Sequence, residues 1–314
     1  MTAPLEPRFW LVLATSAAVT AVLVRLAPRL GWTDGARAAG PEAGRKLQAR
    51  AVPAVGGFGL LAAWIVSPAT FPAGVWASLV LVLLVGALDD RQPLGPLPKL
   101  LLQGLALFPM LLAILAFEGP VEAFALFGLA LVALNVANTF DNADGALASA
   151  GALGFAFATP WGLAGTLGFL LFNLDAPRGR GARDARRSTP SAYLGDAGAH
   201  VLALGLVLHP VALAALWIPA LDLLRLCILR LEVGSRPWIG DRRHLAHGLQ
   251  ERGLSPEQVV LVLLLCALPA CLGAWLEPRL AGSLYLGLAL GASLYLGLLR
   301  WAPVREAASE SGAV

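Results

Sequence analysis

Two adjacent carboxylates close an apolar segment of the chain, and their chemistry needs an explanation. Asp89 and Asp90 end the run LVLLVGALDD. Neighbouring carboxylates repel each other, and a divalent cation is the usual compensation. A solvated helix end is the simpler alternative, and the pair alone leaves both interpretations open.

A second set of polar side chains closes another apolar segment, NVANTFDNADG. Asn135, Asn138, Asp141 and, one position off, Asp144 recur every three residues, which predicts that they share one helix face near its end. Burying unpaired amides and carboxylates costs free energy, so packing alone explains so many of them poorly. The pattern favours a functional site.

A further acidic residue, Asp196, stands between two glycines in LGDAG, immediately before an apolar segment. Aspartate at this place can cap a helix N-terminus. An aspartate flanked by glycines at a helix start can also hold a metal ion close to the backbone. Both interpretations stay open at this point.

A basic segment, GDRRHLAH, contains Arg243, His244 and His247. The two histidines are three positions apart, so on a helix they face the same way. Grouped with the acids and amides, they suit phosphate chemistry with Mg²⁺, in which the metal neutralises charge while arginine and histidine orient the phosphates. A basic patch at the membrane interface is the alternative for this segment alone.

Several common catalytic motifs are absent from the sequence. It contains no G-x-x-x-x-G-K-[ST], no H-E-x-x-H and no G-x-S-x-G. ATP-driven transport, intramembrane zinc proteolysis and α/β-hydrolase chemistry therefore lack support.

The composition indicates the kind of scaffold that must position these groups. Of the 314 residues, 58% are hydrophobic and only 14% are charged, which argues against both a water-soluble globule and a disordered chain. The net charge of +3 does not predict a nucleic-acid partner. The three cysteines lie in apolar runs without paired spacing, as buried packing thiols do. We expect a polytopic protein of the lipid bilayer.

Apolar runs of membrane-spanning length recur along the whole chain. A helix needs about 20 apolar residues to cross the hydrocarbon. Runs near that length cover residues 9–26, 52–67, 73–88, 100–117, 121–137, 211–228, 259–275 and 280–299, and shorter ones cover 146–159, 161–171 and 197–208. The sequence predicts an all-α bundle of about 10–11 transmembrane helices. We expect the short runs to be half-length or re-entrant, and residues 1–314 to form a single domain.

Positive charge is distributed very unevenly among the predicted loops. Alternate loops together hold 21 of the 23 Lys and Arg residues, which leaves only Arg8 and Arg279 for the other side. Under the positive-inside rule the N-terminus is outside, the C-terminus is cytoplasmic, and every polar cluster described above faces the cytoplasm.

Taken in order, these segments resemble the polyprenyl-phosphate N-acetylhexosamine-1-phosphate transferase family. The family includes the phospho-MurNAc-pentapeptide translocase and GlcNAc-1-phosphate transferases, and GALDDR favours the latter branch. The resemblance spans about residues 45–253. It rests on RKLQARAVPAVGG, GALDDR, N-x-x-N-x-x-D-x-x-D-G, Asn173 at the end of a span, LGDAG, the P-x-x-D-x-x-R of Pro219, Asp222 and Arg225, and DRRHLAH.

The resemblance implies a reaction at the bacterial inner membrane, with the active site facing the cytoplasm. UDP-HexNAc and undecaprenyl phosphate would give undecaprenyl-diphospho-HexNAc and UMP, the first membrane step of a cell-envelope polysaccharide, with Mg²⁺ as cofactor and Mn²⁺ as an alternative. It also implies roles for individual residues. Asp196 would bind the metal, Asp89 and Asp90 would position metal and lipid phosphate, Lys46, Asn138, Asp141, Asp144 and Asn173 would hold the nucleotide and sugar phosphate, and Arg243, His244 and His247 would grip the diphosphate.

Some positions depart from the family pattern and keep other functions open. Ala246 and Gln48 stand where the family usually has histidine. One alternative is therefore a catalytically altered member of the family that acts as a scaffold. Asp141 to Ala148 also spells the D-x-x-D-G-x-x-A of CDP-alcohol phosphatidyltransferases, but Ser149 follows where that motif needs Arg. A transporter would want its charges in mid-span rather than at helix ends. A homodimer is left open.

Overall fold

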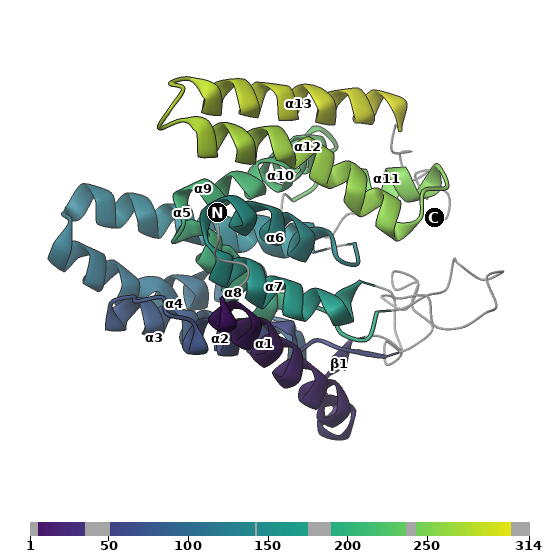
Figure 1. Cartoon of the computed structure of the whole chain (residues 1–314). Coiled ribbons are helices and arrows are strands. Elements are labelled where there is room, and N and C mark those ends of the chain that lie inside the picture. Colours follow the sequence, from purple (N-terminus) through teal and green to yellow (C-terminus); the bar gives the residue numbers. More distant parts are fainter. Residues whose placement is uncertain (1–5, 35–50, 142, 175–189, 237–242, 303–314) are drawn as a thin grey trace.

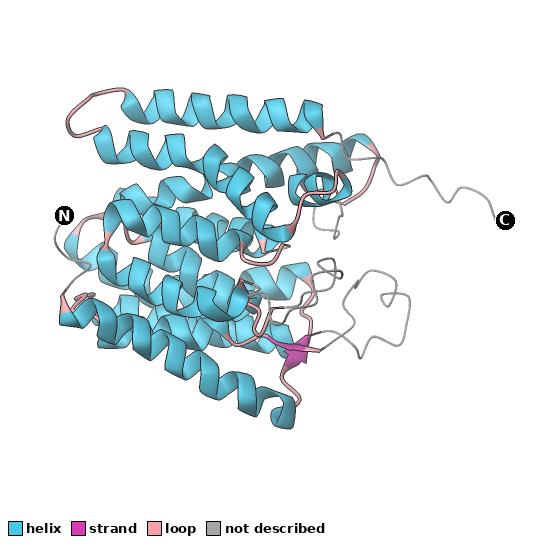
Figure 2. Cartoon of the chain, turned by 45° about the vertical axis from the view of Figure 1, so that its right-hand side comes forward, coloured by secondary structure: helices cyan, strands magenta, loops and turns pink. Residues whose placement is uncertain are grey.

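The structure is a computed structural model that describes residues 6–34, 51–141, 143–174, 190–236 and 243–302. These residues form a bundle of helices that run roughly parallel or antiparallel to one another (Figure 1). Strands β1 (Thr33–Asp34) and β2 (Val52–Pro53) form a short antiparallel pair, drawn in magenta in Figure 2. The prediction of an all-α fold is confirmed.

The helices follow the predicted apolar runs closely. The first half of the described chain contains α1 (Pro7–Leu26), the 3-10 turn η2 (Ala27–Leu30), α2 (Gly56–Val66), α3 (Ala73–Arg91), α4 (Pro96–Phe117) and α5 (Pro120–Phe140). The second half contains α6 (Ala146–Ala158), α7 (Pro160–Asn173), α8 (Gly195–Val207), α9 (Pro210–Leu213), η4 (Ala214–Leu216), α10 (Trp217–Glu232), α11 (Leu245–Glu251), α12 (Pro256–Leu276) and α13 (Ser283–Trp301).

Seven segments are long and apolar enough to cross a membrane: α1, α3, α4, α5, the α9–η4–α10 segment, α12 and α13. The chain is therefore a multi-pass membrane protein. Three shorter apolar helices, α2, α6 and α8, lie between them. Residues 146–171, which are too few for two full crossings, form the two short helices α6 and α7, as predicted.

Proline marks the start of several of these helices. Pro96, Pro120, Pro160, Pro210 and Pro256 each stand at the first helical position, where a missing N–H costs nothing and the fixed φ suits a helix. Gly119–Pro120, Thr159–Pro160 and His209–Pro210 separate predicted apolar runs, and all three are helix boundaries.

Helix α8 lies in the interior of the bundle and packs against α2, α3 and α5. Every residue from Ala197 to Val207 is buried. Glycine permits this close approach, because a Cβ at Gly86 of α3 would lie 2.4 Å from the backbone nitrogen of Ala197. The end of α3 is thereby held against the start of α8.

Several segments that carry predicted site residues meet at one end of the bundle. Tyr193, just before α8, donates its N–H to Pro53 of β2 and accepts from Val55 and Gly56, so the β strands and the start of α8 lie together. Helix α11 lies at the same end of the bundle as β1 (Figure 1). The charge asymmetry predicts that this end is cytoplasmic.

Candidate active site

The N-terminus of α8 is capped by carboxylates from other elements. Asp90 accepts hydrogen bonds from the backbone N–H groups of Asp196, at 2.8 Å, and Ala197, at 3.1 Å. Asp141 accepts from the backbone N–H of Gly195. The first N–H groups of a helix have no partner within the helix and favour negative charge. Two acids distant in sequence therefore fix the start of the helix that carries Asp196.

Lys99 of α4 connects Asp196, at the start of α8, to Asp89, near the end of α3. Its Nζ donates to Asp89 Oδ2 at 2.8 Å and also to Asp196 Oδ2. In the carboxamide orientation that satisfies both neighbours, Asn138 accepts from Lys99 at 2.7 Å and donates to Asp196 Oδ1. Asp89 Oδ1 accepts from the backbone of Leu94 at 2.6 Å. One ammonium thus ties α3, α4, α5 and α8 together.

We call Asp89, Asp90, Lys99, Asn138, Asp141 and Asp196 the carboxylate–lysine cluster. The sequence predicted all of these as site residues except Lys99. In the sequence, Lys99 is one of the positive charges that predict the topology, and nothing in its spacing connects it to acids on other helices.

The second polar set is divided between a helix and a turn. Helix α5 ends at Phe140, so the expectation that Asp141 and Asp144 continue its polar face is wrong. Asn135 and Asn138 are helical, whereas Asp141 occupies the cap position. Burial, together with the charges of nearby Asp196, Asp90 and Asp144, raises the pKa of Asp141 well above its ordinary value.

A separate polar centre forms around Asp222 of α10. Its buried carboxylate accepts from Tyr295 Oη at 2.7 Å, from Arg225 Nη2 at 3.0 Å and from His244 Nδ1 at 2.7 Å. The backbone N–H of Leu245 points at the same carboxylate from 3.4 Å. Because a carboxylate only accepts, Nδ1 of His244 carries a proton. Asp222 and Arg225 belong to the P-x-x-D-x-x-R segment, whereas Tyr295 was not predicted.

This centre also places the predicted basic residues. The imidazole rings of His244 and His247 lie 6.2 Å apart, as their spacing predicted. The backbone carbonyl of Arg243 accepts from Arg225. The described hydrogen bonds of His244 connect it to Asp222 rather than to the carboxylate–lysine cluster.

Among the remaining predicted residues, Asn173 belongs to neither group. Asn173, the last residue of α7, donates to the carbonyl of Ala192 at 3.0 Å, and its carboxamide oxygen is buried without a hydrogen-bond partner among the described residues. Lys46 and Gln48 lie outside the described residues.

The fit to a metal ion can be judged from the donors present. The cluster offers carboxylate and amide oxygens, which are the ligands Mg²⁺ prefers. Within the described part of the chain, however, no three Asp, Glu, His or Cys side chains form a group that could hold a metal ion. Both oxygens of Asp90 face backbone N–H groups, and Lys99 bridges Asp89 and Asp196. This arrangement does not provide a ready Mg²⁺ site.

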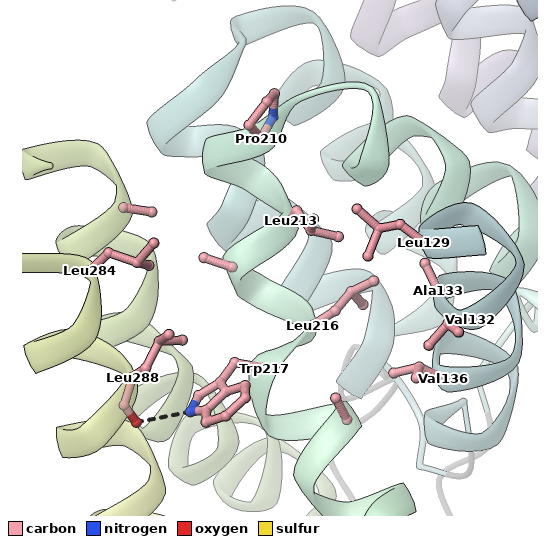
Figure 3. A pocket seen from close by; sticks show the side chains of 13 residues that line it. Leu129, Val132, Ala133, Val136, Pro210, Leu213, Leu216, Trp217, Leu284 and Leu288 are labelled. Carbon is pink, nitrogen blue, oxygen red and sulfur yellow. Dashed lines mark hydrogen bonds between the residues drawn. The ribbon is translucent and has the colours of Figure 1, made fainter. Parts of the chain in front are cut away.

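An apolar cavity of about 300 Å³ lies between α5, the α9–α10 segment, α12 and α13 (Figure 3). Leu129, Val132 and Val136 of α5 face Leu213, Trp217 and Leu288 across it. The Trp217 indole donates to the carbonyl of Leu288 at 2.9 Å, so its polar atom is satisfied. Helix α5 therefore borders an apolar cavity along its middle and carries Asn138 near its end.

The chain matches no protein-family model, and it matches no curated protein.

Proposed function

We propose that this protein transfers HexNAc-1-phosphate, with GlcNAc-1-phosphate as the favoured case, from a UDP-sugar to undecaprenyl phosphate, releasing UMP. The observation that carries the proposal is the carboxylate–lysine cluster. Acids, an amide and an ammonium from α3, α4, α5, α8 and the α5–α6 turn converge at one end of a membrane bundle. Polar groups of this kind are expensive in a membrane protein and are retained for function.

A lipid acceptor agrees with the apolar cavity on α5, the helix that also carries Asn138. The apolar cavity beside α5 suits a hydrocarbon chain, and the same helix brings Asn138 and the Asp141 turn to the polar end. A polyprenyl phosphate has this division, with a long apolar tail and one charged headgroup. We infer that its tail follows the cavity and its phosphate reaches the cluster.

The proposed reaction does not need a strong general base. The second pKa of a phosphate monoester is near 6, so the lipid phosphate is mostly dianionic at neutral pH and already nucleophilic. Its oxygen attacks the sugar-linked phosphorus of the UDP-sugar, one phosphoanhydride forms while the other breaks, and UMP leaves. Holding the two phosphates in line and offsetting their charge supply the rate. Lys99 and the basic groups around His244 are the cations proposed for that role.

The proposal is tested with purified protein in lipid nanodiscs, given undecaprenyl phosphate, MgCl₂ and labelled UDP-GlcNAc. MgCl₂ is included because the resemblance implies this cofactor, and a parallel reaction contains EDTA. We expect a labelled lipid and equimolar UMP, and neither with Asp196→Asn. A panel of other UDP-HexNAc donors identifies the preferred sugar.

The control is Glu118→Gln, which should retain activity, because Glu118 is exposed and follows the end of α4 opposite to Lys99. Binding of UDP-sugar without product from any donor would favour the scaffold interpretation instead. Transfer from a CDP-alcohol, or no binding of either nucleotide, would refute the proposal.

A further inference from the structure

A chain of hydrogen bonds with a fully buried centre lies deeper in the bundle than the carboxylate–lysine cluster. Gln103 Nε2 lies 3.0 Å from His200 Nε2, and Asn135 Nδ2 donates to Gln103 Oε1 at 2.9 Å. At the other end, His200 Nδ1 lies 3.2 Å from the carbonyl oxygen of Val82. Gln103 and His200 are both 0% exposed. We call Gln103, Asn135 and His200 the deep polar layer.

Elementary donor and acceptor rules fix the direction of every bond in this layer. A carbonyl oxygen can only accept, so His200 Nδ1 carries the proton that it donates to Val82. In the neutral ring Nε2 is then an acceptor, and it receives an N–H from the Gln103 carboxamide. The carboxamide oxygen of Gln103 is left to accept from Asn135. The layer is satisfied in this arrangement and not in the reversed one.

Each side chain of the layer lies about one helical turn from a member of the carboxylate–lysine cluster. A separation of three or four residues places two side chains on the same helix face. The pairs are Gln103 and Lys99 on α4, Asn135 and Asn138 on α5, and His200 and Asp196 on α8. Val82 belongs to α3, the helix that carries Asp89 and Asp90.

We propose that Gln103, Asn135 and His200 are positioning residues that fix the register of α4, α5 and α8 beneath the cluster. Sliding or rotating one of these helices would unpair buried polar groups, and such groups are costly where no water can replace the lost partner. The inference rests on the proposed function only in its activity test, in which UMP release is measured.

Lys99 offers a direct measure of the cluster, because Lys99 and Lys46 are the only lysines in the sequence. An ammonium held by two carboxylates and an amide should react slowly with an amine-labelling reagent. Reductive methylation with isotopic formaldehyde, followed by mass spectrometry, gives the labelling rate of Lys99 relative to Lys46. In Gln103→Met and His200→Leu we expect this ratio to rise roughly tenfold, the change in an equilibrium that follows from leaving a buried polar group without its partner.

Two variants separate positioning from general loosening of the bundle. Ser78 Oγ accepts from the backbone N–H of Met110 at 3.0 Å, which is also a buried contact between α3 and α4. Ser78→Ala removes that bond far from the cluster and should leave the labelling ratio unchanged. Lys99 should be better protected from labelling in His200→Gln than in His200→Leu, because the glutamine carbonyl can accept the hydrogen bond from Gln103 that Nε2 of His200 accepts.

The histidine tautomer gives a second, independent measurement. The chain has four histidines, so ¹⁵N-histidine NMR is tractable, and the His200→Gln variant assigns the His200 signals. We expect a neutral ring protonated at Nδ1. A ring protonated at Nε2, or protection of Lys99 that survives Gln103→Met, overturns the inference, and so does an equal rise of the ratio in Ser78→Ala.

Activity measurements then distinguish this inference from the proposed function. If the wild type releases UMP, Gln103→Met and His200→Leu should lower kcat/KM roughly 10- to 100-fold through misplacement of the cluster, with His200→Gln close to wild type. If the wild type releases no UMP, the proposed function fails, whereas the labelling and NMR results still decide whether the deep polar layer positions the cluster.

Discussion

Replacing Lys99 by methionine removes the one ammonium that connects Asp89, Asp196 and Asn138. Methionine fills a similar volume, so the change isolates the charge and its hydrogen bonds. The side chains of Lys99, Asp89 and Asp196 are only 13%, 12% and 21% exposed, so water can replace the lost ammonium in part only. The two carboxylates would then repel each other with no cation between them.

The size of the effect follows from these contacts. Removing one partner of a fully buried ion pair costs about 3–5 kcal/mol. The residual exposure of all three side chains lowers this, and we expect Lys99→Met to reduce the free energy of unfolding by about 2–4 kcal/mol. For a chain of 314 residues that corresponds to a fall in Tm of roughly 3–6 °C.

The assay is thermal unfolding of the purified protein in detergent, with Arg91→Met as the matched control. Arg91 ends the same helix as the acids but is exposed, so its loss removes the same charge at a cost below about 0.5 kcal/mol. A fall in Tm for Lys99→Met no larger than that for Arg91→Met would show that the ammonium does not hold the cluster. A further expected result is that MgCl₂ raises the Tm of Lys99→Met more than that of the wild type, because a divalent cation can replace the lost charge.

Three other predictions follow from individual contacts. Asp90→Asn leaves one oxygen for two backbone N–H groups, and should cost about 1–2 kcal/mol of stability and abolish UMP release; an unchanged Tm would contradict the capping role. The raised pKa of Asp141 means that the folded protein holds a proton that the unfolded chain releases above pH 3.8, so stability falls as pH rises towards the folded pKa. In Asp141→Asn the fall in Tm between pH 4 and 8 should be smaller, and an identical pH dependence would refute this assignment. Tyr295→Phe removes the hydroxyl shared by Asp222 and Arg225 and should cost about 1–3 kcal/mol, whereas the same change at the exposed Tyr285 should cost nothing measurable.

The helices could be predicted from the sequence because hydropathy and proline act locally. Gly119–Pro120 and His209–Pro210 end one apolar run and begin the next, and the structure breaks its helices there. The end of α5 could not be predicted in this way. The period of three that continues through Asp141 and Asp144 suggests a longer helix, but the chain turns after Phe140, where Asp141 binds the start of α8 instead.

The acids of the site could be predicted because a carboxylate in an apolar chain is unusual wherever it occurs. Their partners could not, because partners depend on which helices are neighbours. Asp90 was expected to bind a metal, and the structure directs both of its oxygens to the backbone of α8. His200 and Gln103 are ordinary polar residues in the sequence, and only the packing of α4 against α5 and α8 brings them together.

The charge balance of the cluster limits how it can work. Asp89, Asp90, Asp141 and Asp196 bring four carboxylates together, and Lys99 supplies one positive charge among them. So much unbalanced negative charge is not stable in a poorly hydrated place, so it must be offset by bound protons or by a cation. The pKa of Asp141 is raised by burial and by neighbouring carboxylates, so a proton on this group is one way to reduce the charge. If protons supply the rest, stability should fall as pH rises and MgCl₂ should have little effect. If a cation does, MgCl₂ should stabilise the protein most at high pH, where it no longer competes with protons for the same oxygens.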